Sequence, residues 1–199
     1  MRNTTLRWIA ATATVLIGAL LIATLWIAVL RPESAPQLGP PMGQGDYALT
    51  MTDGGTFTPE TLEGAPSLVF FGFTHCPEVC PTTLGDIGAM QAALEEEGAD
   101  PIRTFFVTVD PERDSADLLG EYVGWVEDVT GVTGSREEID KAISSFRIYA
   151  AKVPLEDGDY TMDHSASILL FDADGRFVTP ISYQEATDSA VAKIRGVQS

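Results

Sequence analysis

The sequence predicts an α/β domain with a central mixed sheet flanked by helices, preceded by one transmembrane helix. Three observations carry this prediction. Residues 8–30 contain no charged side chain over 23 positions. Residues 67–73 and 102–109 are runs rich in Val and Phe, which are typical of strands buried on both faces of a parallel sheet. The segment between these runs changes to a helical period, which indicates a strand–helix–strand unit.

The first segment of the chain has the length and charge pattern of a membrane anchor. A hydrocarbon core about 30 Å thick requires about 20 apolar residues, and residues 8–30 meet that length. Arg2 and Arg7 precede them with no acidic residue, so the charge bias holds the amino terminus in the cytoplasm. We therefore expect residues 1–31 to be a single-pass anchor in a bacterial inner membrane, with the rest of the chain in the periplasm. A cleavable signal peptide is the alternative, although its apolar region would be shorter.

The chain beyond the anchor is strongly acidic. The whole sequence has 12 Lys and Arg against 29 Asp and Glu, a net charge of −17. Three basic residues lie in the first 31 positions, which leaves 9 basic against 29 acidic side chains, a balance of −20. This charge excludes the basic footprint of a nucleic-acid-binding protein. The two cysteines of the sequence are too few for a disulfide-rich scaffold.

The exported part is expected to begin with a linker. Residues 32–45 are rich in Pro, Gly and Gln, which favours an extended spacer over a core element. The folded domain is then expected at residues 46–199. We expect it to start with a hairpin, because apolar and polar residues alternate at residues 47–51, residues 53–55 predict a turn, and residues 56–57 begin the returning strand.

Periodicity and capping signals predict the remaining elements. Leu84, Ile87 and Leu94 lie on one face of a helix that follows Pro81. Ser135, with Glu138 three positions later, predicts a capping box. The other expected elements are helices at residues 115–126, 135–146 and 184–195, and strands at residues 148–153, 167–171 and 176–181.

Both cysteines lie in one short segment, residues 76–81 (CPEVCP), between a predicted buried strand and the start of a helix. Residues four apart on a helical turn have Cβ atoms about 5–6 Å apart. Cys76 and Cys80 could therefore form a disulfide after a small closure or hold one metal ion between their sulfurs. A disulfide here would close a very short loop and add little stability. Because N–H groups at a helix start lower a thiol pKa, we predict a reactive or metal-ligating pair.

Two soft thiolates select Cu(I) and also suit Zn(II), and a third ligand would influence the choice. His75 is next to Cys76, but neighbouring side chains diverge at a strand end, so we expect His75 outside the ligand set. Met162 is more typical of a core position. His164 lies in a predicted loop directly before a strand and could reach the cysteines. The alternative for His164 is a loop histidine hydrogen-bonded to Asp163.

Three acidic residues, Asp110, Glu112 and Asp114, follow the second predicted strand. We interpret this segment as a turn with a helix cap. A docking surface for a partner protein is the alternative, because the carboxyl ends of strands carry the sites of such sheets.

The sequence resembles the Sco/SenC family of membrane-anchored copper proteins. The resemblance covers about residues 47–194, nearly all of the exported part. Four segments carry it, in the same order and at similar intervals: residues 72–84 (GFTHCPEVCPTTL), 108–114 (TVDPERD), 130–135 (TGVTGS) and 162–165 (MDHS).

The resemblance implies a thioredoxin-like fold that binds one copper ion through Cys76, Cys80 and His164. Two thiolates would hold Cu(I), and the imidazole would extend the site to Cu(II). Asp163 is expected to orient His164 as an outer-shell partner. The resemblance further implies delivery of copper to the binuclear copper centre of cytochrome c oxidase during its assembly. The copper-bearing oxidase subunit would be the partner, and another copper chaperone is left open as the donor.

The alternative function is a thiol-disulfide oxidoreductase that reduces the target cysteine pair before copper enters. The redox pair would again be Cys76 and Cys80. Redox motifs of the thioredoxin type have two residues between the cysteines, whereas three stand here. Dithiol exchange also has no need for His164, so both observations favour metal binding. Peroxide reduction is weaker still, because no Arg accompanies the cysteine motif.

Overall fold

The computed structural model describes residues 16–20, 24, 40–156 and 158–198. The chain divides into two compact units, Met1–Gly39 and Pro40–Ser199. Most of the predicted anchor and linker lies outside the described residues, and no helix among the described residues is long and apolar enough to cross a membrane. The second unit includes the end of the predicted linker, since Gly43 donates its backbone N–H to the Ser145 carbonyl at 3.0 Å.

A seven-stranded mixed sheet forms the centre of the second unit, in the order β2-β1-β5-β4-β3-β8-β9. The three middle strands β5, β4 and β3 are parallel, and the outer strands pair antiparallel. The predicted mixed sheet is therefore confirmed. The strands are β1 (Leu49–Met51), β2 (Thr56–Phe57), β3 (Ser67–Gly72), β4 (Arg103–Thr108), β5 (Val129–Thr133), β8 (Ile168–Phe171) and β9 (Phe177–Ile181).

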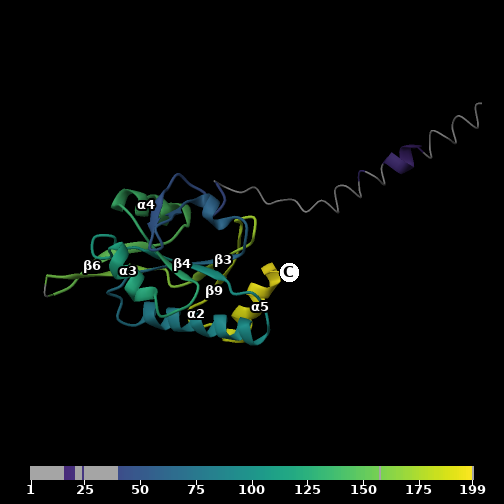
Figure 1. Ribbon diagram of the computed structural model, residues 1–199. Coiled ribbons are helices and arrows are strands. Elements are labelled where there is room, and N and C mark those ends of the chain that lie inside the picture. The colour runs from purple at the N-terminus through teal and green to yellow at the C-terminus, as the bar shows by residue number, and fades with distance from the viewer. Residues whose placement is uncertain (1–15, 21–23, 25–39, 157, 199) are drawn as a thin grey trace, which may run out of the picture. The chain divides into compact units, whose positions relative to one another are not determined.

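Helices cover both faces of this sheet, with α2 and α5 on one side and α4 on the other (Figure 1). Every residue of β3 is buried, as its apolar run predicts. Phe70 packs edge-on against Phe106, which in turn contacts Tyr122 of α3. The next residue, Phe71, points to the other face of the sheet and packs against Phe146, the C-cap residue of α4. The helical elements are η1 (Pro59–Leu62), α2 (Val79–Glu96), α3 (Ala116–Val123), α4 (Arg136–Ser145) and α5 (Thr187–Gln198).

A separate two-stranded sheet is made by β6 (Ala150–Pro154) and β7 (Tyr160–His164). The expectation that His164 lies in a loop was wrong, because Ala150 pairs with His164 in this antiparallel hairpin. β5 was also not predicted. Its sequence VTGVT is short, and only its last three residues are buried.

The predicted capping box of α4 forms only in part. The Ser135 side chain accepts from the Glu138 N–H at 3.2 Å. The Glu138 carboxylate, however, accepts from the Ala48 N–H at 2.8 Å and pairs with Lys141. Glu138 thus joins α4 to the chain just before β1 instead of closing its own helix end.

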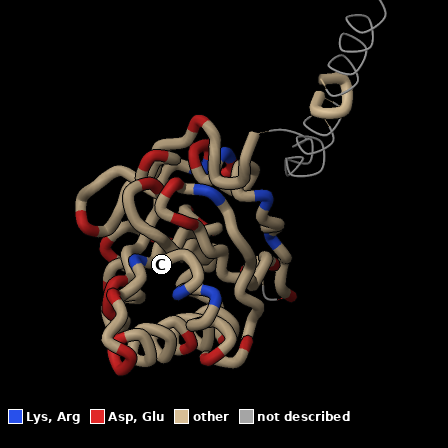
Figure 2. Tube along the Cα trace, turned by 90° about the vertical axis from the view of Figure 1, so that its right-hand side faces the viewer, with Lys and Arg blue, Asp and Glu red and all other residues tan. Residues whose placement is uncertain are grey.

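The charge of the second unit is distributed along its length. Figure 2 shows Asp and Glu on helices, loops and turns throughout the trace, in keeping with the excess of acidic over basic side chains. Several of the few basic residues pair with acids in this unit, among them Arg113, Arg136 and Lys141.

Candidate metal centre

Sheet topology brings together the two segments that carry the predicted ligands. β3 pairs antiparallel with β8 in a register that sets Val69 beside Leu169. The C-terminal end of β3 and the N-terminal end of β8 therefore lie at the same end of the sheet. The cysteine segment follows β3, and His164 lies four residues before Ile168, the first residue of β8. Strand pairing thus explains how residues 84 positions apart meet.

The cysteine turn connects β3 to α2. The Cys76 N–H donates to the Phe73 carbonyl at 3.3 Å, which closes the turn. Cys80 lies in the first turn of α2, and its backbone N–H donates to Cys76 Sγ at 3.3 Å. Both thiols are free, with Cys80 buried and Cys76 partly exposed. The helix start therefore directs an N–H group at a sulfur, as expected for a reactive or ligating thiol.

Gly72 allows Cys80 to pack directly on the sheet. A Cβ atom at this position would lie 2.9 Å from Cys80 Sγ and 2.6 Å from Phe106 Cζ. Any larger residue would have to displace one of these side chains. Gly72 was not predicted to be part of the site, although a glycine at the end of a buried strand is a known signal of close approach.

His164 completes the group from the end of β7. Its Nδ1 lies 2.9 Å from the Ser165 carbonyl oxygen and its Nε2 lies 3.6 Å from Cys80 Sγ. Because a carbonyl only accepts, Nδ1 carries a ring hydrogen, and Nε2 is left facing the sulfur of Cys80. The edge-on ring of Phe73 supports the imidazole, with a centroid separation of 5.6 Å. This arrangement is typical of a histidine prepared for a metal.

The ligand atoms of Cys76, Cys80 and His164 all lie within 4.8 Å of one another. The three candidates therefore meet at one point. The other two do not join them: His75 is exposed and contacts the Thr74 hydroxyl through Nδ1 at 3.0 Å, while Met162 is buried in the core.

The outer partner of His164 differs from the expected one. Asp163 is exposed, and the adjacent positions Met162 and His164 point to the opposite face of the strand. The Ser165 carbonyl accepts the Nδ1 hydrogen instead of Asp163.

The two thiols differ strongly in acidity. A hydrogen bond from Cys80 lowers the pKa of Cys76 to about 4, against the opposing effect of burial. Hydrogen bonding to Cys76 and burial both raise the pKa of Cys80. At neutral pH the pair therefore holds one negative charge and one proton. The second proton leaves when an electrophile or a metal ion replaces it.

Two of the three acidic side chains that follow β4 are buried. Asp110 and Asp114 both have 0% exposure, so they do not form the docking surface considered as an alternative. The Asp114 carboxylate accepts from the Thr74 N–H at 3.1 Å, the Thr74 hydroxyl at 2.5 Å and the Thr108 hydroxyl at 2.6 Å. Asp114 thus fixes the start of the cysteine turn. The expected helix cap is provided by the next residue, Ser115.

Comparison with known proteins identifies relatives along most of the chain. The family model described as SCO1/SenC matches residues 35–199. The chain is 37% identical over 175 residues to the mitochondrial SCO2 homologue of Danio rerio, covering 83% of this chain and 63% of the relative. It is 35% identical over 137 residues to an SCO2-like protein of Rickettsia felis, covering 67% and 66%. The chain spans about half to two thirds of the length of such curated relatives.

Solved structures agree with this result. The structure of Bradyrhizobium japonicum ScoI with copper bound is 42% identical, with a TM-score of 0.71 over 78% of this chain and 99% of that chain. Yeast Sco1 with copper bound is 31% identical, with a TM-score of 0.72 over 79% and 88%. The expected thioredoxin-like α/β fold is confirmed, and the chain belongs to the SCO1/SenC family.

Proposed function

We propose that this protein binds one copper ion through Cys76, Cys80 and His164 and delivers it to the binuclear copper centre of cytochrome c oxidase during its assembly. The observation that carries the proposal is the convergence of three ligand atoms within 4.8 Å. Family membership and the copper-bound relatives support copper as the ion. The copper-bearing oxidase subunit is the proposed recipient, and another copper chaperone is the proposed donor.

The chemistry of the ligands fits both copper oxidation states. Two thiolates are the soft donors that Cu(I) prefers, and the imidazole adds the harder donor that Cu(II) requires. Cys76 needs no deprotonation at neutral pH, whereas Cys80 must release its proton on binding. Cys76 is the less buried of the two cysteines, so we expect exchange with a thiolate of a partner protein to begin there. The site therefore suits a carried ion better than a permanent one.

The test uses the full-length protein in detergent, reduced and then given Cu(I) or Cu(II). We expect one equivalent of either ion, and we expect Cys76→Ser or Cys80→Ser to abolish tight binding of both. His164→Ala should remove the thiolate–Cu(II) absorption bands while Cu(I) is still retained. His75→Ala is the matched control, since His75 is exposed and outside the group. Unchanged Cu(II) bands in His164→Ala would contradict the proposal.

A second candidate function is reduction of a disulfide in the target protein. The observation that favours it is the unequal pair of free thiols, with a low pKa at Cys76 and a raised pKa at Cys80. The Cys76 thiolate would attack the target disulfide and expel one target thiolate. Cys80 would then lose its proton, attack Cys76 Sγ and release the second target thiolate. Two electrons pass to the target, and the protein is left as a disulfide.

Copper-free protein separates the two functions. A peptide disulfide with the cysteine spacing of the target is mixed with reduced protein, and released thiols are counted. If this reduction proceeds readily and is undiminished in His164→Ala, the reductase function takes first place. If copper binding requires His164 and the peptide is not reduced, copper delivery stands alone.

We also propose that residues 1–31 anchor the protein in the inner membrane, that residues 32–45 are a linker, and that residues 46–199 bind copper in the periplasm. The uncharged segment at residues 8–30 supports this organisation. Alkaline extraction should leave the protein in the membrane fraction, and the purified protein should have the mass of the full chain. Release into the soluble fraction with a shortened amino terminus would support a cleaved signal peptide instead.

A further inference from the structure

The hairpin that carries His164 has little sheet support of its own. Within the described part of the chain, β6 and β7 pair only with each other. Two-stranded hairpins are marginally stable in isolation. Three of the five residues of β6 are exposed, and Met162 is the one buried residue of β7. Side-chain contacts must therefore decide where the hairpin lies.

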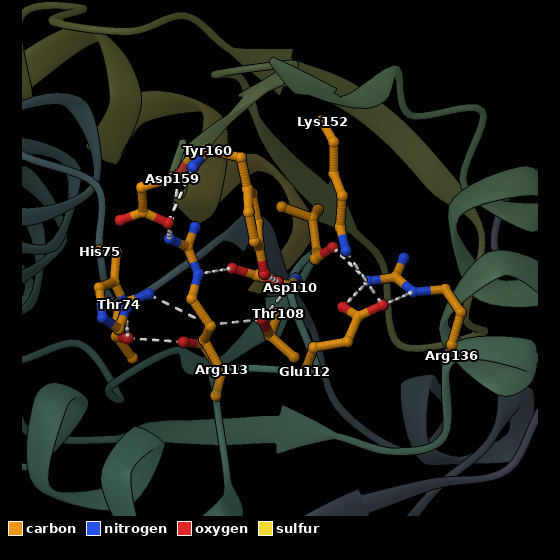
Figure 3. A network of polar contacts seen from close by, with 12 residues as sticks. Thr74, His75, Thr108, Asp110, Glu112, Arg113, Arg136, Lys152, Asp159 and Tyr160 are labelled. Atoms are coloured by element: carbon orange, nitrogen blue, oxygen red, sulfur yellow. Dashed lines mark hydrogen bonds and ion pairs between the residues drawn. The ribbon is translucent and has the colours of Figure 1, made fainter. Parts of the chain in front are cut away.

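A ring of three side chains attaches β7 to the segment after β4. Arg113 donates from Nη1 to the Tyr160 carbonyl at 3.0 Å, and its guanidinium carbon lies 3.8 Å from the centroid of the Tyr160 ring. Arg113 Nε pairs with one carboxylate oxygen of Asp110. The Tyr160 hydroxyl donates to the other oxygen of Asp110 at 2.9 Å. Figure 3 shows the contacts between these side chains. We call Asp110, Arg113 and Tyr160 the clamp.

The burial of the clamp makes its contacts specific. The Asp110 side chain is fully buried, and the Arg113 side chain is 17% exposed. A buried charge that loses one partner keeps its desolvation cost without compensation, so alternative arrangements of these side chains are strongly disfavoured. The planar guanidinium also fixes the orientation of the Tyr160 ring, which a lysine would not do.

Tyr160 is coupled to His164 by the geometry of the strand. Residues 160, 162 and 164 alternate with their neighbours and share one face of β7. Tyr160 contacts Asp110, Met162 is buried in the core and His164 faces Cys80. Four residues of strand span only about 13 Å. A shift of Tyr160 is therefore transmitted to the imidazole.

The same segment also holds the cysteine side of the site. Asp114 accepts from both the N–H and the hydroxyl of Thr74, two residues before Cys76. The N–H groups of Arg113 and Asp114 donate to the Asp110 carbonyl at 3.1 and 3.0 Å, which makes residues 110–114 one tight turn. Both halves of the site are thus attached to a single short segment.

We propose that Asp110, Arg113 and Tyr160 are positioning residues that hold His164 in register with Cys76 and Cys80. This proposal rests on the proposed copper binding. It adds the contacts that set the selectivity of the site between Cu(I) and Cu(II). Two thiolates from one turn hold Cu(I) whether or not the hairpin is in place. Cu(II) depends on the imidazole, so loosening the clamp weakens Cu(II) binding selectively.

The test compares Tyr160→Phe with wild type in the full-length protein. The substitution removes one hydroxyl and retains the ring beneath Arg113. Because Tyr160 does not bond His164 directly, we expect the Cu(II) affinity to fall about threefold to tenfold, less than when a direct hydrogen-bond partner of a metal ligand is lost, with Cu(I) affinity changed less than about twofold. The thiolate–Cu(II) absorption bands and the electron paramagnetic resonance spectrum should also change. Arg113→Lys keeps the charge but loses the planar, forked guanidinium, so it should also weaken Cu(II) binding more than Cu(I) binding.

Two controls keep the outcomes distinct. Tyr149→Phe changes an exposed tyrosine beside the same hairpin and should leave both affinities unaltered. In nuclear magnetic resonance spectra of the metal-free variants, the imidazole resonances of His75 serve as an internal reference for those of His164, because His75 is exposed and outside the site. A wild-type Cu(II) spectrum and affinity in Tyr160→Phe would overturn the clamp, as would equal losses of Cu(I) and Cu(II). If His164→Ala itself leaves Cu(II) binding unchanged, the proposed function fails, and not the clamp alone.

Discussion

The cysteine turn and the histidine hairpin meet at one point but are built in different ways. Cys76 lies in the short connection between the fully buried β3 and the long helix α2, and Cys80 lies in the first turn of that helix. His164 ends a two-stranded sheet in which Met162 is the one buried residue. The turn is held by backbone hydrogen bonds and close packing on Gly72. The hairpin depends on a few polar side chains, above all Asp110 and Arg113.

Because of this difference, the two oxidation states of the proposed copper ion depend on different parts of the site. The rigid turn supplies the thiolate pair, which suffices for Cu(I). The less supported hairpin supplies the imidazole, which Cu(II) needs in addition. Low local stability is typical of elements that move during function. We infer that the imidazole separates from the ion more easily than the thiolate pair does.

The largest expected effect concerns the acidity of the turn. Because the pKa of Cys76 is lowered to about 4, its thiolate persists as the pH falls toward that value. The rate of alkylation of reduced, copper-free protein should be nearly constant from about pH 8 to about pH 5.5, where an ordinary thiol would slow roughly 300-fold. Cys80→Ala removes the hydrogen bond that contributes most to the lowered pKa of Cys76, so the loss of rate should begin at a higher pH than in wild type. A tenfold loss of rate per pH unit in wild type would contradict the assignment.

The second prediction breaks the connection between the two regions. Asp114→Ala leaves the Thr74 N–H and the Thr108 hydroxyl without their buried acceptor. We expect the free energy of unfolding to fall by about 3 kcal/mol, since each unsatisfied buried group costs roughly 1–3 kcal/mol. Urea denaturation of the metal-free protein measures this loss. Asp100→Ala, at an exposed position, should change stability by less than about 0.5 kcal/mol; a similar loss in both variants would refute the role of Asp114.

The third prediction tests the packing of the turn. Gly72→Ala would bring a methyl group 2.6 Å from Phe106 Cζ and 2.9 Å from Cys80 Sγ. Overpacking of this kind destabilises by about 1–3 kcal/mol. Gly85→Ala is the matched control, because its Cβ would meet nothing within 4 Å on an exposed position of α2. It should stabilise the protein by about 0.5–1 kcal/mol. A neutral Gly72→Ala would mean that Cys80 can move freely away from β3.

The two regions also differ in how far the sequence predicts them. β3 and α2 follow from an apolar run, a helical period and cysteine spacing, all of which are local patterns. β5 and β7 were missed because both are short, and neither has a continuous apolar run. Their strand state depends on partners far along the chain, such as Ala150 opposite His164.

The candidate site shows the same division. The pairing of Cys76 with Cys80 follows from spacing, whereas the choice of His164 over its alternatives came from the family resemblance. Spacing alone could not select His164, since its contact with Cys80 depends on the antiparallel register of β3 and β8. The interpretation of residues 110–114 as a turn with a helix cap is confirmed, but the burial of Asp110 and Asp114 was not predicted, because acidic residues are rarely fully buried. Their burial becomes evident only when the elements above them are in place.

The smallest expected effect is at the exposed rim of the hairpin. Lys152 Nζ lies 3.4 Å from a Glu112 oxygen and 4.5 Å from the centroid of the Tyr160 ring, and its side chain is 46% exposed. In Lys152→Gln, Glu112 keeps Arg136 at 2.9 Å, and this arginine is the main reason that the pKa of Glu112 is lowered to about 2. Glu112 therefore stays ionised and paired at neutral pH.

Because an exposed ion pair and an exposed cation–π contact each contribute at most about 1 kcal/mol, Lys152→Gln, which loses one of each, should lower stability by less than about 2 kcal/mol. Any such loss should shrink in high salt, since exposed charges are screened. The Cu(II) spectrum and affinity should remain those of wild type, because the contacts between Asp110, Arg113 and Tyr160 are untouched. If Lys152→Gln instead weakened Cu(II) binding as much as Tyr160→Phe, the position of His164 would depend on the exposed rim of the hairpin and not on its buried attachment.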